Sequence, residues 1–145
     1  MKNILFICTG NSARSIIAES IINHKYSQFY KSYSAGSNPA GQINVWIKKF
    51  LEEKKKYNLN NYFSKNFEIF LDKKINFYQV ITVCNNANNE VCPIWPEKKK
   101  ILHWDIDDPV SQIKNEKDEE KAFLVINRTF NTIEDKINLW IKNEK

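Results

Sequence analysis

The chain has 145 residues, a formal net charge of +5 and a pI of about 9.0. This length suits one compact domain, residues 1–145, and no apolar run is long enough to cross a bilayer. The positive charge is nearly all lysine spread along the chain, which is typical of a solvated surface rather than a nucleic-acid-binding face. Met1 leads almost directly into an apolar stretch and leaves no room for a signal peptide, so we expect a cytoplasmic protein.

The first predicted element is a buried strand at residues 4–7, which are four consecutive apolar residues. A tight turn follows, because the next residues are small or polar and include Gly10 and Asn11. A helical pattern begins at Ser15 and aims its unpaired N–H groups back at this turn. We therefore predict a binding loop for a tetrahedral oxyanion. Its members are Thr9, Gly10, Asn11, Ser12, Ala13 and Arg14.

Cys8 lies at the mouth of this loop, where the N–H groups, the helix end and Arg14 would stabilise a thiolate. We predict that Cys8 is a nucleophile near neutral pH. Arg14 can hold two oxygens of a phosphate-like group, and Ser15 can donate a hydrogen bond to the sulfur. The alternative is a buried thiol beside a surface arginine, but the strand before the motif and the helix after it favour a catalytic site.

Strands and helices alternate along the rest of the chain. Apolar spacing predicts helices at about residues 15–30, from residue 43 into the charged run 52–56, at 65–71, and over about 123–140. Further strands are predicted at 32–36, 79–84 and 99–104, with polar connections at 58–64 and 85–91. The side chains expected to point inward from the first and third helices include Ile17, Ile21, Ile22, Tyr26, Phe29, Phe67, Phe70 and Leu71. This order predicts an α/β fold: a single domain with a four-stranded, mainly parallel sheet flanked by helices on both faces.

The three cysteines are Cys8, Cys84 and Cys92, an odd number that argues against a structural disulfide framework. A zinc site would need a closer cysteine pair and more histidine, so we expect no metal and no cofactor. Cys84 ends a predicted strand, as Cys8 does. We therefore expect both cysteines at the carboxyl edge of the sheet, where such folds bind ligands.

Asp108 follows the last predicted strand and precedes Pro109, which stiffens its backbone. A carboxylic acid placed over the loop could protonate an oxygen leaving group. The alternative is that Asp107, Asp108 and Pro109 only form a turn.

Residues 8–15 (CTGNSARS) resemble the signature loop of low-molecular-weight protein tyrosine phosphatases and of the thioredoxin-coupled arsenate reductases that share their fold. With Cys84, Cys92 and the Asp108-Pro109 pair, the resemblance to the reductases spans nearly the whole chain. It implies a low-molecular-weight phosphatase-like fold and an oxyanion substrate, arsenate or phosphate, with no nucleic-acid or membrane partner.

The resemblance also implies a role for each thiol. Cys8 attacks arsenic, Cys84 attacks the sulfur of Cys8, and Cys92 attacks Cys84. Thioredoxin then reduces the resulting disulfide. Asp108 matches the proton donor of the family. Seven residues separate Cys84 from Cys92, one more than in the well-studied reductases.

Two other positions depart from the family pattern. Ala13 stands where many members carry a further cysteine, a change that does not touch the relay. Lys65 stands where some members have an aspartate that helps to hold a potassium ion, together with residues matching Asn11, Glu19 and Ser34. A lysine ammonium in the place of the cation predicts little dependence on potassium.

Two other functions stay open at this point. A phosphatase acting on phosphotyrosine or another monoester would need Cys8, Arg14 and Asp108 but not the later thiols. A non-catalytic module that binds phosphate or nucleic acid through the basic surface would not need a reactive Cys8.

Overall fold

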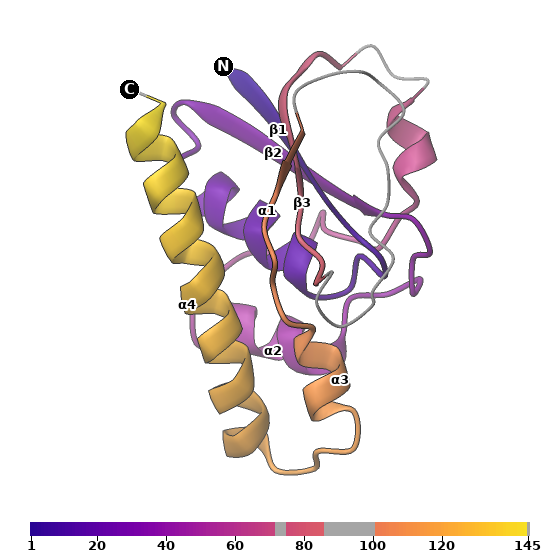
Figure 1. Cartoon of the computed structure of the whole chain (residues 1–145). Coiled ribbons are helices and arrows are strands. Elements are labelled where there is room, and N and C mark those ends of the chain that lie inside the picture. The colour runs from indigo at the N-terminus through magenta and orange to yellow at the C-terminus, as the bar shows by residue number, and fades with distance from the viewer. Residues whose placement is uncertain (72–74, 86–100, 145) are drawn as a thin grey trace.

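The computed structural model describes residues 1–71, 75–85 and 101–144 (Figure 1). These residues form a four-stranded parallel sheet in the order β2-β1-β3-β4. The strands are β1 (Lys2–Cys8), β2 (Tyr30–Gly36), β3 (Phe77–Thr82) and β4 (Ile101–His103). The helices are α1 (Arg14–Lys25), α2 (Val45–Glu53), α3 (Pro109–Ile113) and α4 (Glu119–Asn143), with a 3₁₀-helix η1 (Phe67–Phe70).

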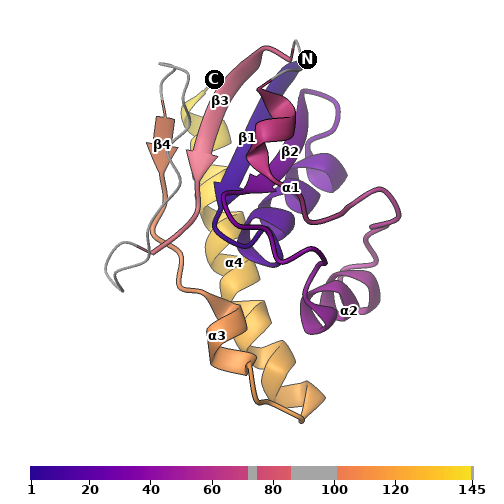
Figure 2. The same cartoon turned by 90° about the vertical axis from the view of Figure 1, so that its right-hand side faces the viewer.

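Strand β1 lies inside the sheet and is buried on both faces, as its four apolar residues predict. Ile4 and Phe6 pack into the cluster that contains the apolar faces of α1 and α4, whereas Leu5 and Ile7 pack with Phe70 of η1 on the other face. Successive side chains of a strand point to opposite faces, so a continuous apolar run suits this position. The larger helices cover one face of the sheet and η1 lies on the other (Figure 2). The predicted fold class is confirmed.

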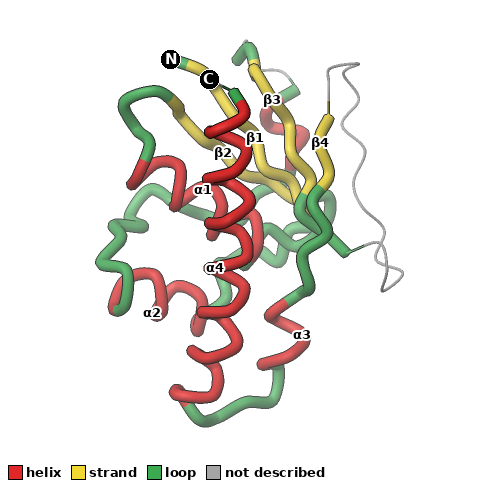
Figure 3. Tube along the Cα trace, turned by 60° about the vertical axis from the view of Figure 1, so that its left-hand side comes forward, coloured by secondary structure: helices red, strands yellow, loops and turns green. Residues whose placement is uncertain are grey.

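Helix α4 is the long helix that the spacing of apolar residues predicts. Its carboxylate N-cap, Asp118, accepts hydrogen bonds from the N–H groups of Glu120 and Lys121. Apolar side chains recur every three or four residues and are buried. The helix contacts α1, α2 and α3 (Figure 3). The buried apolar side chains of α4 are Ala122, Phe123, Ile126, Phe130, Ile133, Ile137, Trp140 and Ile141.

Two side chains that we expected in the core are exposed. Helix α1 ends at Lys25 instead of residue 30, because β2 already begins at Tyr30, and this leaves Phe29 66% exposed in the turn. Leu71 is 39% exposed because the segment forms a 3₁₀-helix. In this helix residues three apart share one side, so Phe67 and Phe70 point together and Leu71 does not.

The ends of the other elements also differ from the prediction. Strand β3 ends at Thr82, two residues before Cys84, and β4 is the three residues Ile101–His103. Pro109 starts α3, a helix that we did not predict, with Asp108 as its N-cap. Residues 86–91, Cys92 and residues 99–100 lie outside the described residues. Within the described ranges, no helix combines the length and apolarity needed to cross a membrane.

Candidate active site

A cavity opens at the carboxyl ends of β1 and β3, where the sequence predicts the site. One wall is Cys8 and the predicted oxyanion loop, and the other comes from the chain after β3 and β4. The lining residues are Cys8, Thr9, Gly10, Asn11, Ser12, Ala13, Arg14, Asn85, Asp107, Asp108, Val110, Ser111 and Gln112. The cavity thus brings together all six predicted loop residues, Cys8 and Asp108.

Cys8 is a free thiol whose residue is only 2% exposed. Its Sγ lies 2.9 Å from Oγ of Ser15 and accepts a hydrogen bond from the backbone N–H of Asn11 at 3.2 Å. The side-chain amide of Asn11 also donates to Oγ of Ser15 at 2.8 Å, so the hydroxyl hydrogen of Ser15 remains available for the sulfur. These two contacts fix the position of the Cys8 sulfur atom.

Three carbonyl groups of the loop are engaged by the connection between β2 and α2. Those of Thr9, Gly10 and Ser12 accept hydrogen bonds of 2.9–3.0 Å from three backbone N–H groups of the connection between β2 and α2. The three donors are Asn38, Ala40 and Asn44. With these carbonyls engaged elsewhere, the N–H groups of the loop are the backbone groups left to meet an anion.

Close packing against β2 explains a glycine that the sequence did not single out. A Cβ atom on Gly36 would lie 2.4 Å from the carbonyl oxygen of Thr9 and 3.1 Å from Asn11. No side chain fits in this space, so Gly36 allows the end of β2 to support the loop directly.

Asn11 ties the loop to the interior. It is fully buried and has a positive φ of 46°, a conformation that asparagine tolerates better than most residues. Its amide donates to the hydroxyls of Ser15 and Ser34, and its Oδ1 accepts from the backbone N–H of Lys65 at 2.9 Å. The amide nitrogen and the amide oxygen of Asn11 thus both have hydrogen-bond partners. The loop is therefore held in place before any ligand binds.

A buried carboxyl group lies behind this network. Ser34 donates to Oε1 of Glu19 at 2.6 Å, and burial raises the pKa of Glu19 although the nearby charge of Lys65 and this hydrogen bond lower it. Asn11, Ser34 and Glu19, which the family resemblance groups around a cation, are therefore linked to each other directly. The ammonium of Lys65 donates to the carbonyl of Phe63 at 2.8 Å. Weak potassium dependence stays a prediction.

Arg14 is the first residue of α1 and is only 4% exposed, although it lines the cavity. Its guanidinium donates to the carbonyl oxygen of Ile106 at 2.9 Å. This contact ties the anion loop to the segment that follows β4, which also carries Asp107 and Asp108.

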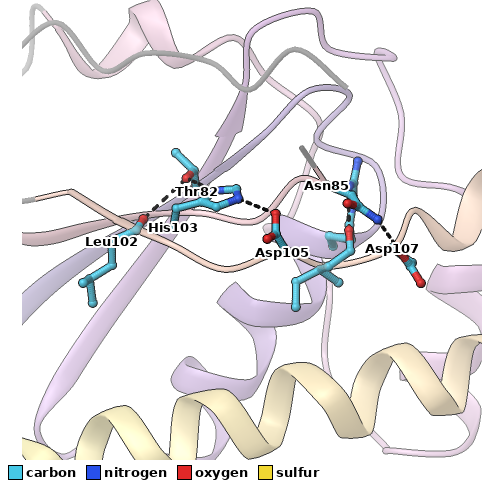
Figure 4. Close-up of polar contacts among 8 residues, drawn as sticks. Thr82, Asn85, Leu102, His103, Asp105 and Asp107 are labelled. Carbon is cyan, nitrogen blue, oxygen red and sulfur yellow. Dashed lines mark hydrogen bonds and ion pairs between the residues drawn. The ribbon is translucent and has the colours of Figure 1, made fainter. Parts of the chain in front are cut away.

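Asp108 caps a helix and also borders the cavity. Its carboxylate accepts a hydrogen bond from the N–H of Val110 at 2.9 Å and so caps α3, and the residue lines the same cavity as Cys8. Asp107 accepts a hydrogen bond from the side-chain amide of Asn85 (Figure 4). We did not predict Asn85 as a site residue; its polarity directly after Cys84 was the available signal.

Cys84 lies at the neighbouring strand end and is fully buried. The N–H of Val83 donates to the carbonyl of Ile7 at 2.9 Å, so the chain around Cys84 still runs beside the end of β1. Cys92 lies outside the described residues. Across the described ranges, no group of three or more histidine, cysteine or acidic side chains is arranged to hold a metal ion.

The parallel sheet and the cysteine-containing anion loop at its carboxyl edge define an α/β protein built to bind an oxyanion beside a thiol. Residues 3–145 match the family model described as low molecular weight phosphotyrosine protein phosphatase, and the chain belongs to this family. It is 34% identical to an arsenate reductase of Shouchella clausii over 141 residues, which cover 97% of this chain and 93% of that protein.

Solved structures show the same fold. A thioredoxin-dependent arsenate reductase of Corynebacterium glutamicum has a TM-score of 0.59 and 25% identity, covering 96% of this chain and 63% of that one. A low molecular weight protein tyrosine phosphatase of T. tengcongensis has a TM-score of 0.66 and 20% identity, covering 95% of this chain and 99% of that one.

Proposed function

We propose that this protein is an arsenate reductase in which Cys8, Cys84 and Cys92 form a thiol relay that thioredoxin regenerates. The observation that carries the proposal is the position of two cysteines at adjacent strand ends. Cys8 lies in an oxyanion-type loop, and Cys84 follows the next strand of the sheet. The similarity to the Shouchella clausii arsenate reductase over nearly the whole chain supports this substrate, and the Corynebacterium glutamicum neighbour supports thioredoxin as the reductant.

In the first step the Cys8 thiolate attacks arsenic while the loop N–H groups and Arg14 hold the arsenate oxygens. An S–As bond forms and an As–O bond breaks. The departing oxygen takes a proton from Asp108 and leaves as water. Arsenic is still in its pentavalent state in this adduct.

In the second step the Cys84 thiolate attacks Sγ of Cys8. An S–S bond forms and the S–As bond breaks with its electron pair on arsenic, which leaves as arsenite. Two thiols have then supplied the two electrons. Cys8 and Cys84 belong to the same chain and follow neighbouring strands, so this attack is intramolecular.

In the third step the Cys92 thiolate attacks Cys84, which releases Cys8 as a thiolate and transfers the disulfide to Cys84 and Cys92. The two thiols of reduced thioredoxin then exchange with this disulfide. A relay of this kind needs reduced thiols between cycles, which fits the cytoplasm that we expect from the sequence.

The test is arsenate-dependent oxidation of NADPH with thioredoxin and thioredoxin reductase present. We expect sustained turnover for the unaltered protein and none after the first cycle for Cys92→Ser. Hydrolysis of p-nitrophenyl phosphate by the same variant is the matched control, because it needs only Cys8 and the loop. No NADPH oxidation by fully reduced protein that still hydrolyses the phosphoester would refute the relay.

A phosphatase is the second candidate, because Cys8, Arg14 and Asp108 line one cavity without any contribution from Cys92. The family and the T. tengcongensis neighbour agree with this chemistry. A phosphatase would keep its turnover of a phosphotyrosine peptide in both Cys84→Ser and Cys92→Ser. The reductase would lose multiple turnover of arsenate in both variants.

A further inference from the structure

A buried asparagine joins the end of β3 to the segment that carries Asp108. Asn85 follows Cys84 directly and is only 6% exposed. Its side-chain amide donates a hydrogen bond to Oδ1 of Asp107, the residue before Asp108 (Figure 4). Asn85 and Asp107 both line the cavity around Cys8. The proposed relay assigns no role to this contact.

The chain that follows β4 is held at three points. The N–H of Ile106 donates to the carbonyl oxygen of Cys84 at 3.4 Å, and Nη1 of Arg14 donates to the carbonyl oxygen of Ile106 at 2.9 Å. The third point is the contact of Asn85 with Asp107. Ile106 is almost completely buried, whereas Asp107 is exposed to solvent. Among the described residues, Asn85 is the only hydrogen-bond partner of the Asp107 side chain, so this exposed carboxylate depends on Asn85 for its place on the cavity wall.

The chain after Asp108 is fixed by α3. Pro109 is the first residue of this helix, and Oδ1 of Asp108 accepts a hydrogen bond from the N–H of Val110 at 2.9 Å. Among the described residues, no hydrogen bond reaches the other carboxyl oxygen, Oδ2. A carboxyl oxygen without a partner can carry the proton that a leaving oxygen needs. Asp108 is therefore anchored on one side by the helix that it caps and on the other by the contact of Asp107 with Asn85.

We propose that Asn85 is a positioning residue for proton transfer: by holding Asp107, its amide keeps Asp108 beside the oxyanion loop. This inference rests on the proposed role of Asp108 as the proton donor. When Cys8 attacks arsenate, an S–As bond forms, and the As–O bond that breaks leaves its electron pair on a hydroxyl oxygen. The carboxyl proton of Asp108 passes to this oxygen, which leaves as water. If Asp108 were displaced, the oxygen would have to leave as hydroxide, a much poorer leaving group.

Two phosphoesters with different leaving groups test this role. The p-nitrophenolate ion is a stable leaving group that needs little help from an acid, whereas phenolate leaves much faster when it is protonated. Asn85→Ala should therefore lower kcat/KM for phenyl phosphate about tenfold, and kcat/KM for p-nitrophenyl phosphate by no more than about threefold. A merely structural defect would lower both values equally. The assay uses the form that the structure describes, in which Cys84 is disulfide-bonded and Cys8 is free.

Variants of Asp107 give the second arm of the test. Asp107→Ala should reproduce the loss seen in Asn85→Ala, and the double variant should lose no more than either single variant, because both act through one contact. Asp107→Asn keeps an oxygen that can accept the hydrogen bond from Asn85, so it should restore kcat/KM for phenyl phosphate. The matched control is Asn127→Ala, at an asparagine of α4 that does not line the cavity around Cys8.

Asp108→Asn separates the inference from the role on which it rests. This variant should lose about a hundredfold in kcat/KM with phenyl phosphate and much less with p-nitrophenyl phosphate; equal losses would refute Asp108 as the proton donor. If Asp108→Asn loses phenyl phosphate selectively but Asn85→Ala and Asp107→Ala lose neither substrate, or both equally, Asn85 has no positioning role. Urea unfolding shows whether each variant is folded. If Asn85→Ala is not, the comparison of Asp107→Ala with Asp107→Asn, at an exposed position, gives the same decision.

Discussion

The two strand ends at the carboxyl edge of the sheet each carry a cysteine, but their surroundings differ. At the end of β1, Cys8 accepts a hydrogen bond from the loop N–H of Asn11 and contacts Ser15 in the first turn of α1. At the end of β3, Cys84 is fully buried, and its carbonyl is held by a longer hydrogen bond of 3.4 Å from Ile106. The free thiol of Cys8 has an anion site built around it, whereas Cys84 is disulfide-bonded in this structure and shielded from solvent.

This difference shows how one sheet edge can serve two kinds of thiol chemistry. The anion loop is held by the backbone of the following connection and by the buried Asn11 side chain, so it is organised before a ligand arrives. A thiol that attacks only another sulfur needs no anion site, and it benefits from burial that keeps solvent thiols away. Variants at the two ends should therefore fail in different ways.

The largest effect is expected for Cys8→Ser. This change removes the nucleophile, so both arsenate reduction and p-nitrophenyl phosphate hydrolysis should fall by at least about a thousandfold. The melting temperature should change little, because serine is nearly isosteric. Substantial phosphoester hydrolysis by this variant would show that another group attacks the substrate.

Cys84→Ser should separate the two ends of the sheet. Phosphoester hydrolysis should remain within about threefold of the unaltered protein, because the oxyanion loop is intact, while arsenite release should stop. Single-turnover arsenite measurement and the phosphatase assay on one preparation give the comparison. Parallel loss of both activities would mean that Cys84 supports the loop structurally.

Gly36→Ala should distort the oxyanion loop where the end of β2 packs against it. The new Cβ would lie 2.4 Å from the carbonyl oxygen of Thr9, an overlap that we expect to cost about 1–3 kcal/mol of unfolding free energy and to lower phosphate affinity. Gly10→Ala is the control for stability, because its Cβ would make an ordinary 3.6 Å contact with Ser12. Urea unfolding of both variants measures the difference, and equal stability would contradict the close packing.

The smallest effect is the pH dependence contributed by Glu19. Burial raises the pKa of this carboxyl above its usual 4.5, so between the two values the folded protein keeps a proton that the unfolded chain has lost. The Glu19 contribution to stability is therefore complete below pH 4.5 and decreases as pH rises through the folded-state pKa, by at most about 1.4 kcal/mol per pH unit. Glu19→Gln should flatten urea-unfolding stability in this range, whereas Glu52→Gln at an exposed site should not. A steeper slope in Glu19→Gln would reverse the assignment.

The sequence predicted the parts of the fold that depend on local patterns. The apolar run of β1, the spacing in α4 and the polar turn after Cys8 each follow from neighbouring residues. The end of α1 could not be predicted in this way, because its pattern continues to Phe29 and only the start of β2 at Tyr30 stops the helix. Helix α3 did have a local signal, an aspartate followed by proline, which suits an N-cap and the first helical position.

The candidate site also has parts that follow from local sequence patterns and parts that depend on tertiary packing. The anion loop is contiguous in sequence, so its members could be named before the structure was known. The contact between Thr82 and His103 joins positions 21 residues apart and depends on the register of β3 with β4. The requirement for Gly36 likewise depends on how closely β2 approaches the loop. Such contacts are set by tertiary packing and leave no local pattern.

The most direct test of the relay is a stoichiometry. Fully reduced protein is mixed with arsenate without any external reductant, and arsenite, remaining thiols and disulfide position are determined after one turnover. The relay predicts one arsenite and two oxidised thiols per chain, with the disulfide between Cys84 and Cys92. Protein that hydrolyses p-nitrophenyl phosphate but keeps all three thiols reduced in the presence of arsenate would contradict the relay.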